Sequence, residues 1–227
     1  MNPNRALGLM RLREILSVFV VVAAAAVLGG CGGSGGTVSN ARPVPDVSSS
    51  ARSGEDLEVP RVDKPLDVSR FVDDPCRLVD QQALDAVGDF GPGKPDVDSE
   101  HAKKSIGPRC SWYANGPGMV SFSVVIDLPH QKYATADLKG LGGVYGAKKS
   151  GLIDYLEPIQ LPGHADYPAV IAGDKSSIDQ GRCSVHIGVA DDLTVAVNFT
   201  NLKDPSRACP AAQQIGASVL GALKSAN

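Results

Sequence analysis

The feature that most constrains this chain is an apolar run near its N-terminus, residues 15–28, which ends at Leu28-Gly29-Gly30-Cys31. Three arginines precede the run and small residues follow it, which is the layout of a secretory signal peptide. The 14 residues of the run fall short of the roughly 20 apolar residues that a membrane-spanning helix needs. The run therefore predicts that the rest of the chain is exported and folds where disulfides form.

Leu28-Gly29-Gly30-Cys31 resembles the lipobox of bacterial lipoprotein precursors. The resemblance implies that residues 1–30 are a signal peptide, that a diacylglyceryl group is joined to the sulfur of Cys31, and that cleavage leaves Cys31 first. Two or more acyl chains, such as palmitate, hold a protein stably on a membrane. We therefore expect a lipoprotein on the extracytoplasmic face of the cell membrane. The alternatives are an ordinary signal peptide cut elsewhere and an uncleaved anchor with Cys31 incidental.

Residues 31–66 are predicted to be the lipidated cysteine and a disordered tether. Glycine, serine and proline are frequent there and large apolar residues are few, so the segment cannot bury enough surface to offset the entropy of ordering. Such a linker reaches on the order of 35 Å. A segment that folds onto a partner is the alternative. Residues 67–227 remain, and their length suits one domain with a single core.

The charge of the chain argues against nucleic acid as a partner. Without residues 1–30, which carry three arginines and Glu14, the formal net charge goes from −3 to −5. The basic residues form only doublets, such as Lys103-Lys104 and Lys148-Lys149. The positive field that binding to phosphates requires is therefore missing.

Four cysteines, Cys76, Cys110, Cys183 and Cys209, remain once Cys31 is assigned to lipid. An even number in an exported domain predicts two disulfides. No Cys-x-x-Cys pair is present, which argues against a zinc knuckle and a thioredoxin-like redox site.

Alternating residues predict two β-hairpins. The first hairpin covers residues 109–114 and 120–128, with a turn at residues 115–118. Cys110 and Trp112 share a face of its first strand, and Phe122 and Val124 share a face of its second strand. In the second hairpin, Cys183 starts an apolar face that runs to residue 189, and residues 193–199 form its partner. Strands are also predicted over residues 152–161 and 169–172.

Two helices are expected to cover the sheet. The first is short, with Asp80 as its N-cap and Gly88 at its end. The second starts at a cap from Asp204 or Ser206 and continues with an apolar stripe at helical spacing. The fold class is therefore α+β: a single domain with a mainly antiparallel sheet, made of two hairpins and one or two further strands, under a short N-terminal and a longer C-terminal helix.

These elements suggest the disulfide pairing. Cys183 points to the core face and Cys209 lies in the first turns of the helix that covers this face, so the two can be joined. Cys76 and Cys110 then join the first helix to the first hairpin.

Two segments have no clear prediction. Residues 89–108 are expected to be a long loop and, with His101, Lys103 and Lys104, a candidate functional surface. Residues 133–150 are expected to start as a helix at 134–138, but their glycines favour a flexible loop afterwards.

The cysteine contexts in order, Asp74-Pro75-Cys76, Cys110-Ser111-Trp112, Cys183-Ser184-Val185 and Cys209 at the start of a helix, resemble a family of actinobacterial secreted lipoproteins of unknown function that includes the Lpr-type lipoproteins of mycobacteria. The resemblance covers about residues 70–223. It implies a lipid-anchored extracytoplasmic domain and supplies no catalytic residues.

No motif in the chain predicts a catalytic residue, a metal or a cofactor. The four histidines, His101, His130, His164 and His186, are scattered, and His186 is expected to be solvated on the polar face of its strand. The mature chain has neither Gly-x-Ser-x-Gly nor Ser-x-x-Lys. Residues 96–98 could offer oxygens to calcium, but nothing completes a calcium loop. Trp112 is expected in the core, and Tyr113, Tyr145, Tyr155 and Tyr167 are candidates for the edge of a groove.

Three functions follow by elimination. The favoured one is a non-enzymatic interaction module of the cell envelope, whose partner is an envelope protein or a cell-wall component. The alternative is a carrier or sensor of a small apolar or lipid ligand. The second alternative is an envelope hydrolase whose site is assembled from distant residues.

Overall fold

The computed structural model describes residues 58–116 and 118–227. The predicted signal peptide, the predicted lipidation site Cys31 and residues 31–57 of the predicted tether lie outside the described residues. Among residues 58–116 and 118–227, no helix is long and apolar enough to cross a membrane.

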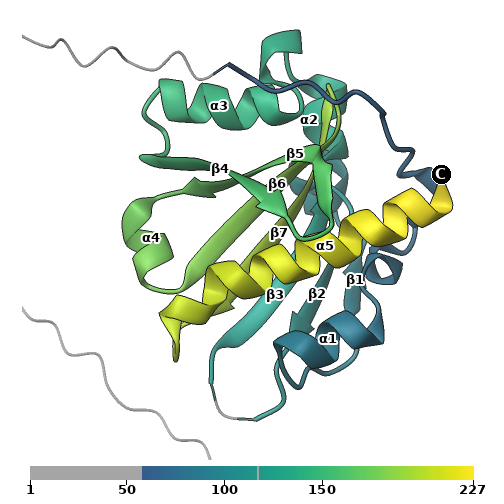
Figure 1. Cartoon of the computed structure of the whole chain (residues 1–227). Coiled ribbons are helices and arrows are strands. Elements are labelled where there is room, and N and C mark those ends of the chain that lie inside the picture. Colours follow the sequence, from purple (N-terminus) through teal and green to yellow (C-terminus); the bar gives the residue numbers. More distant parts are fainter. Residues whose placement is uncertain (1–57, 117) are drawn as a thin grey trace, which may run out of the picture. The chain divides into compact units, whose positions relative to one another are not determined.

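A seven-stranded sheet forms the centre of the domain, and every neighbouring pair of strands is antiparallel (Figure 1). Its strand order is β1-β2-β3-β7-β6-β5-β4. The strands are β1 (Lys94–Asp96), β2 (Arg109–Tyr113), β3 (Val120–Ile126), β4 (Tyr155–Leu161), β5 (His164–Gly173), β6 (Arg182–Ala190) and β7 (Leu193–Asn201). The helices are α1 (Gln81–Val87), α2 (Leu128–Tyr133), α3 (Leu141–Lys149), α4 (Lys175–Asp179) and α5 (Ala208–Ala226).

Both predicted hairpins are confirmed. In β2–β3, Trp112 lies opposite Phe122, both are buried, and their rings stack with centroids 4.6 Å apart. In β6–β7, Cys183 lies opposite Phe199 and Val185 opposite Val197. The apolar halves of these alternating patterns make one face of the sheet, and the main core lies against it.

Helix α5 crosses this core face (Figure 1). The predicted stripe is confirmed, because Ala212, Ile215, Val219 and Leu223 are all completely buried. The predicted side-chain cap is wrong. A single helical turn, η5 (Pro205–Arg207), leads into α5, and the Ser206 hydroxyl donates to the Asp204 carboxylate at 2.6 Å instead of capping the helix.

Helix α1 has the predicted ends. The backbone N–H of Ala83 donates to Asp80 Oδ1 at 2.7 Å, and the helix ends at Gly88. Leu84 and Val87 are buried, and α1 packs beside α5. The α+β fold class expected from the sequence is thus confirmed, with three strands, β1, β4 and β5, beyond the two hairpins.

Both disulfides are present with the predicted pairing. Cys76 is joined to Cys110 and Cys183 to Cys209, with Cα atoms 5.0 and 5.1 Å apart. The second bridge ties the first turn of α5 to the sheet. The first ties the turn η2 (Pro75–Leu78) to β2.

The packed region begins before residue 67. The N–H of Val62 donates to Asp191 Oδ1 at 2.9 Å, the N–H of Leu66 donates to the carbonyl oxygen of Val189 at 2.8 Å, and both side chains are buried. Residues 58–66 of the predicted tether therefore lie against the domain.

Residues 89–108 are not a plain loop. Residues 94–96 pair with β2 as the edge strand β1, and residues 102–106 form a helical turn, η3 (Ala102–Ile106). A three-residue strand is too short to show an alternating pattern, and for this reason the sequence does not reveal it.

The glycine-rich part of residues 133–150 is helix α3 rather than a flexible loop. Gly140 precedes it with φ of 55°, and a Cβ on Gly143 would lie 2.5 Å from the carbonyl oxygen of Leu138. Leu141 and Tyr145 are buried against Val170 of β5 in a second, smaller core. This burial outweighs the low helix propensity of glycine.

Candidate functional site

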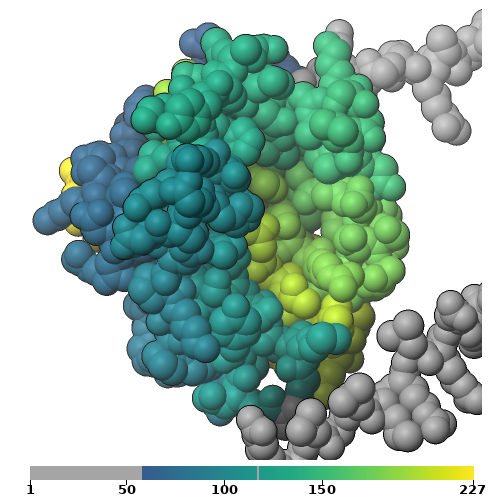
Figure 2. Space-filling model, turned by 180° about the vertical axis from the view of Figure 1, so that it is seen from behind, coloured from purple at the N-terminus to yellow at the C-terminus, as the bar shows by residue number. Residues whose placement is uncertain are grey.

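The face of the sheet opposite α5 carries polar residues in register across four strands. Ser111 pairs with Ser123, Ser123 with Asn198, and Asn198 with Ser184. His186 follows in the next row, opposite Ala196. Figure 2 shows this side of the domain, which is hollowed over the yellow-green segment that contains β6 and β7.

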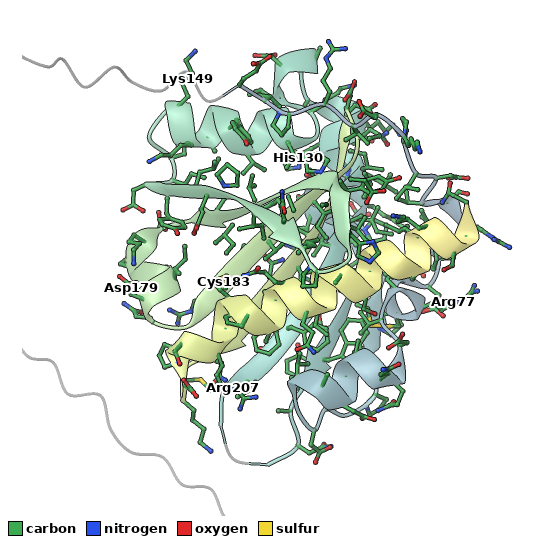
Figure 3. All side chains as sticks on the ribbon, in the orientation of Figure 1. Arg77, His130, Lys149, Asp179, Cys183 and Arg207 are labelled. Carbon is green, nitrogen blue, oxygen red and sulfur yellow. A yellow bond between two sulfur atoms is a disulfide. The ribbon has the colours of Figure 1, made fainter. Side chains whose placement is uncertain are left out.

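A cavity of about 700 Å³ lies on this face, and we call it the α3 pocket. Ser184, His186 and Asn198 form its floor on β6 and β7. Asp127 and His130 line it at the start of α2. The labelled His130 lies close to the N-terminal end of α3 (Figure 3). The other lining residues are mainly small or apolar and come from α3, the segments beside it and β5: Leu138, Gly140, Gly143, Val144, Gly146, Ala147, Ser150, Leu152, Ile153, Ala172 and Gly173.

The two sides of α3 explain why the cavity exists. Leu141 and Tyr145 fix the helix to β5. The residues that α3 presents to the pocket are small, with Gly143, Gly146 and Ala147 among them. Since Cβ atoms at helical spacings of three and four lie on one side of a helix, this side stays short and leaves space above the strands.

His186 is half-buried on the pocket floor. Burial lowers the pKa of its imidazole to about 4, from an ordinary value of 6.5, so the ring is neutral at neutral pH. The prediction of a solvated His186 is wrong. The strand alternation places it correctly on the face away from the core, but α3 covers part of that face.

Asp127 and His130 form a pair at one end of the pocket. His130 Nδ1 lies 2.6 Å from Asp127 Oδ1, and the Thr194 hydroxyl donates to Asp127 Oδ2 at 3.5 Å. Burial raises the pKa of Asp127, and the hydrogen bond from His130 opposes the rise. Both oxygens of this carboxylate therefore have partners within the protein.

Ser184 does not form a catalytic arrangement with His186. Its hydroxyl donates to Asn198 Oδ1 at 2.8 Å. A serine nucleophile needs its proton held by a base, and an amide oxygen is not one. The other serine of the pocket lining, Ser150, donates its hydroxyl to the carbonyl oxygen of Ala147 at 3.1 Å. Both serine hydroxyls of the pocket are thus hydrogen-bonded to carbonyl oxygens and not to a base.

The candidate surface around His101 borders a second, smaller cavity of about 330 Å³, which Asp98, Ala102 and Lys103 help to line. Lys103 pairs with Asp98 at 3.0 Å and Lys104 with Glu100 at 2.5 Å, and all four side chains are well exposed, so these pairs contribute little. We find no functional role for this turn.

The described residues form neither the calcium site nor the tyrosine-edged groove that the sequence suggested. Asp96 is paired with Arg109 at 2.9 Å, and no cluster of three or more acidic, histidine or cysteine side chains among residues 58–116 and 118–227 could hold a metal ion. Trp112 is in the core as predicted. Tyr145 and Tyr167 are buried, Tyr155 is half-buried and Tyr113 is exposed, so the tyrosines do not edge a common groove.

The residues of the α3 pocket were not singled out by the sequence as a group. The available signal was the spacing of small residues at positions 140, 143, 146 and 147, which is typical of one side of a helix. This spacing does not reveal that β6 and β7 lie below the side of α3 that carries the small residues.

No curated protein and no solved structure matches the chain. A family model does match, over residues 26–222, and its description is "Protein of unknown function (DUF3558)". Since the match covers most of the sequence, this chain belongs to the DUF3558 family.

Proposed function

We propose that this protein is a non-enzymatic carrier or sensor that holds a small, mainly apolar ligand in the α3 pocket. The observation that carries the proposal is the pocket itself, with a volume of about 700 Å³. Binding sites for small molecules are mostly apolar clefts of about 300–1,000 Å³ with a few converging polar groups. The pocket fits this description in its size, its apolar α3 wall and its polar floor.

The pocket favours a small ligand over the partner protein or cell-wall component that the sequence favoured. A hydrolase is less well supported, because both serines of the pocket donate hydrogen bonds to carbonyl oxygens, Ser184 to Asn198 Oδ1 and Ser150 to the backbone of Ala147.

The proposal places this carrier at the cell membrane, with Cys31 as the lipid attachment site. Support comes from the apolar run before Leu28-Gly29-Gly30-Cys31 and from the tether-like composition after it. The order of the cysteine contexts supports membership among the Lpr-type actinobacterial lipoproteins. A carrier held in this way stays within reach of the lipid surface without being immersed in it.

The test uses the uncharged dye N-phenyl-1-naphthylamine, whose fluorescence rises in apolar surroundings. The full-length wild type is compared with Ala147→Phe, which extends a ring into the pocket from α3. Ala86→Phe is the matched control, because Ala86 is exposed on α1 and lies away from the pocket.

We expect wild type and Ala86→Phe to bind the dye equally and Ala147→Phe to bind it at least tenfold more weakly, with circular dichroism unchanged in all three. Equal dye binding by wild type and Ala147→Phe would contradict the proposal.

A further inference from the structure

We infer that the α3 pocket selects an uncharged ligand, with a hydrocarbon body against α3 and one hydroxyl, ester or amide group on the floor beside His186. This inference rests on the proposed function, because it names the class of molecule that the same pocket holds. Such a pocket binds neutral lipids and long-chain alcohols in preference to free fatty acids, phosphates and cationic amphiphiles.

The lining of the pocket excludes an anion. None of its described lining residues is a lysine or an arginine. A carboxylate or phosphate that leaves water needs a cation or several strong donors, and without them its transfer is strongly unfavourable. The one acidic side chain at the site, Asp127, would repel an anion further.

The same acidic group already accepts hydrogen bonds within the protein, so it compensates a cation only in part. Asp127 Oδ1 is taken by His130 and Oδ2 accepts from Thr194. An ammonium group would share Asp127 with these donors and would find no second acidic side chain in the pocket lining to offset its loss of water. Asp127 alone is thus a weak site for a cation that leaves water.

The floor suits a neutral polar group. His186 is uncharged at neutral pH because burial lowers its pKa, and a neutral imidazole donates at one nitrogen and accepts at the other. Asn198 Oδ1 is occupied by Ser184, which leaves the amide hydrogens of Asn198 as donors. No hydrogen bond between described residues uses Asn198 Nδ2 or a ring nitrogen of His186. A hydroxyl or carbonyl group of a ligand can therefore be satisfied here.

Two leucines mark where the hydrocarbon meets solvent. Leu138 and Leu152 both line the pocket, yet 44% and 77% of their surfaces are exposed. Large apolar side chains at the rim of a cavity gain from covering by an apolar ligand, at about 25 cal/mol per Å² of buried surface. The ligand's apolar part is therefore placed along α3 and toward these leucines.

Three probes with the same hydrocarbon chain test the selection at neutral pH: dodecanol below its solubility limit, and dodecanoate and dodecylammonium below their critical micelle concentrations. Each probe is titrated against N-phenyl-1-naphthylamine bound to the full-length wild type, and the displaced dye is measured. The signal of Ala147→Phe is subtracted as background. We expect dodecanol to displace the dye at a concentration at least tenfold lower than either charged probe.

Equal or stronger displacement by dodecanoate or dodecylammonium overturns the inference and leaves the proposed function standing. If the dye does not bind the pocket at all, the proposed function fails, and the inference fails with it.

His186→Leu tests the position of the polar group, with Ala86→Leu as the control for an added leucine. We expect His186→Leu to bind dodecanol about five- to tenfold more weakly, while its binding of the dye changes less than twofold. The dye measurement also shows that the variant is folded. An unchanged affinity for dodecanol would place the polar group elsewhere and overturn the inference.

Discussion

The hydroxyl of Ser184 on β6 donates a hydrogen bond of 2.8 Å to the amide oxygen of Asn198, its partner in register on β7. The contact orients the Asn198 amide on the floor of the α3 pocket and keeps the serine proton away from His186. It is the feature that most clearly separates a binding floor from a hydrolytic site.

Ser184→Ala should therefore change stability slightly and esterase activity not at all. Loss of one partly buried hydrogen bond reduces the free energy of unfolding by about 0.5–1.5 kcal/mol, which urea denaturation would measure. Hydrolysis of p-nitrophenyl esters should stay at background in wild type and variant. Turnover by wild type that disappears in Ser184→Ala would instead identify Ser184 as a nucleophile.

Gly143→Ala should destabilise the protein and weaken ligand binding. The added Cβ would lie 2.5 Å from the carbonyl oxygen of Leu138, and a backbone atom cannot yield without moving α3 or the turn before it. We expect a loss of about 1–3 kcal/mol, as for other overpacked sites.

Gly221→Ala is the matched control, because its Cβ would meet only the edge of His164 at 4.0 Å. Within α5 this change should stabilise the protein by about 0.5–1 kcal/mol. Thermal unfolding of both variants gives the comparison. Similar stabilisation by the two substitutions would mean that α3 does not pack closely on the turn at Leu138.

The regular part of the fold could be predicted because each element has a complete local signal. In β6 and β7, every second residue is apolar over most of the strand, and in α1 the cap at Asp80 and the glycine at 88 mark both ends. The disulfide pairing followed, since Cys183 and Cys209 were placed on elements that must face each other.

The site could not be predicted because its signal is divided between distant segments. The alternation of β6 shows that His186 faces away from the core, but the cover over that face comes from α3, whose glycines argue against a helix when read alone. Leu141 and Tyr145 make α3 stable only once Val170 lies beneath them.

The two disulfides should contribute similarly to stability. They close loops between cysteines 34 and 26 residues apart, for which the chain-entropy model gives about 3.5–4 kcal/mol each. Urea denaturation of Cys76→Ala/Cys110→Ala and Cys183→Ala/Cys209→Ala, compared with wild type, measures each contribution. A loss below about 1 kcal/mol for either pair would contradict the prediction.

Stability should fall as pH falls from about 6.5 to about 4, in a manner that depends on His186. The pKa of this imidazole is lowered to about 4 in the folded protein from 6.5. Over this range the unfolded chain therefore binds a proton that the folded protein does not. The stabilisation is complete above the unfolded pKa and is lost below it, by up to about 3 kcal/mol.

His186→Gln removes this titration and leaves that of Asp127, whose raised pKa acts in the opposite direction. The difference between the unfolding free energies of wild type and variant should therefore change with pH between 6.5 and 4. Parallel pH profiles would show that His186 is not desolvated.

Native mass spectrometry of the full-length protein, with solvent extraction of what copurifies, is the most direct test of a ligand in the α3 pocket. We predict that wild type and Ala86→Phe carry an uncharged molecule that organic solvent extracts, and that Ala147→Phe lacks it. The same bound mass in all three preparations, or none in wild type, would contradict the carrier function.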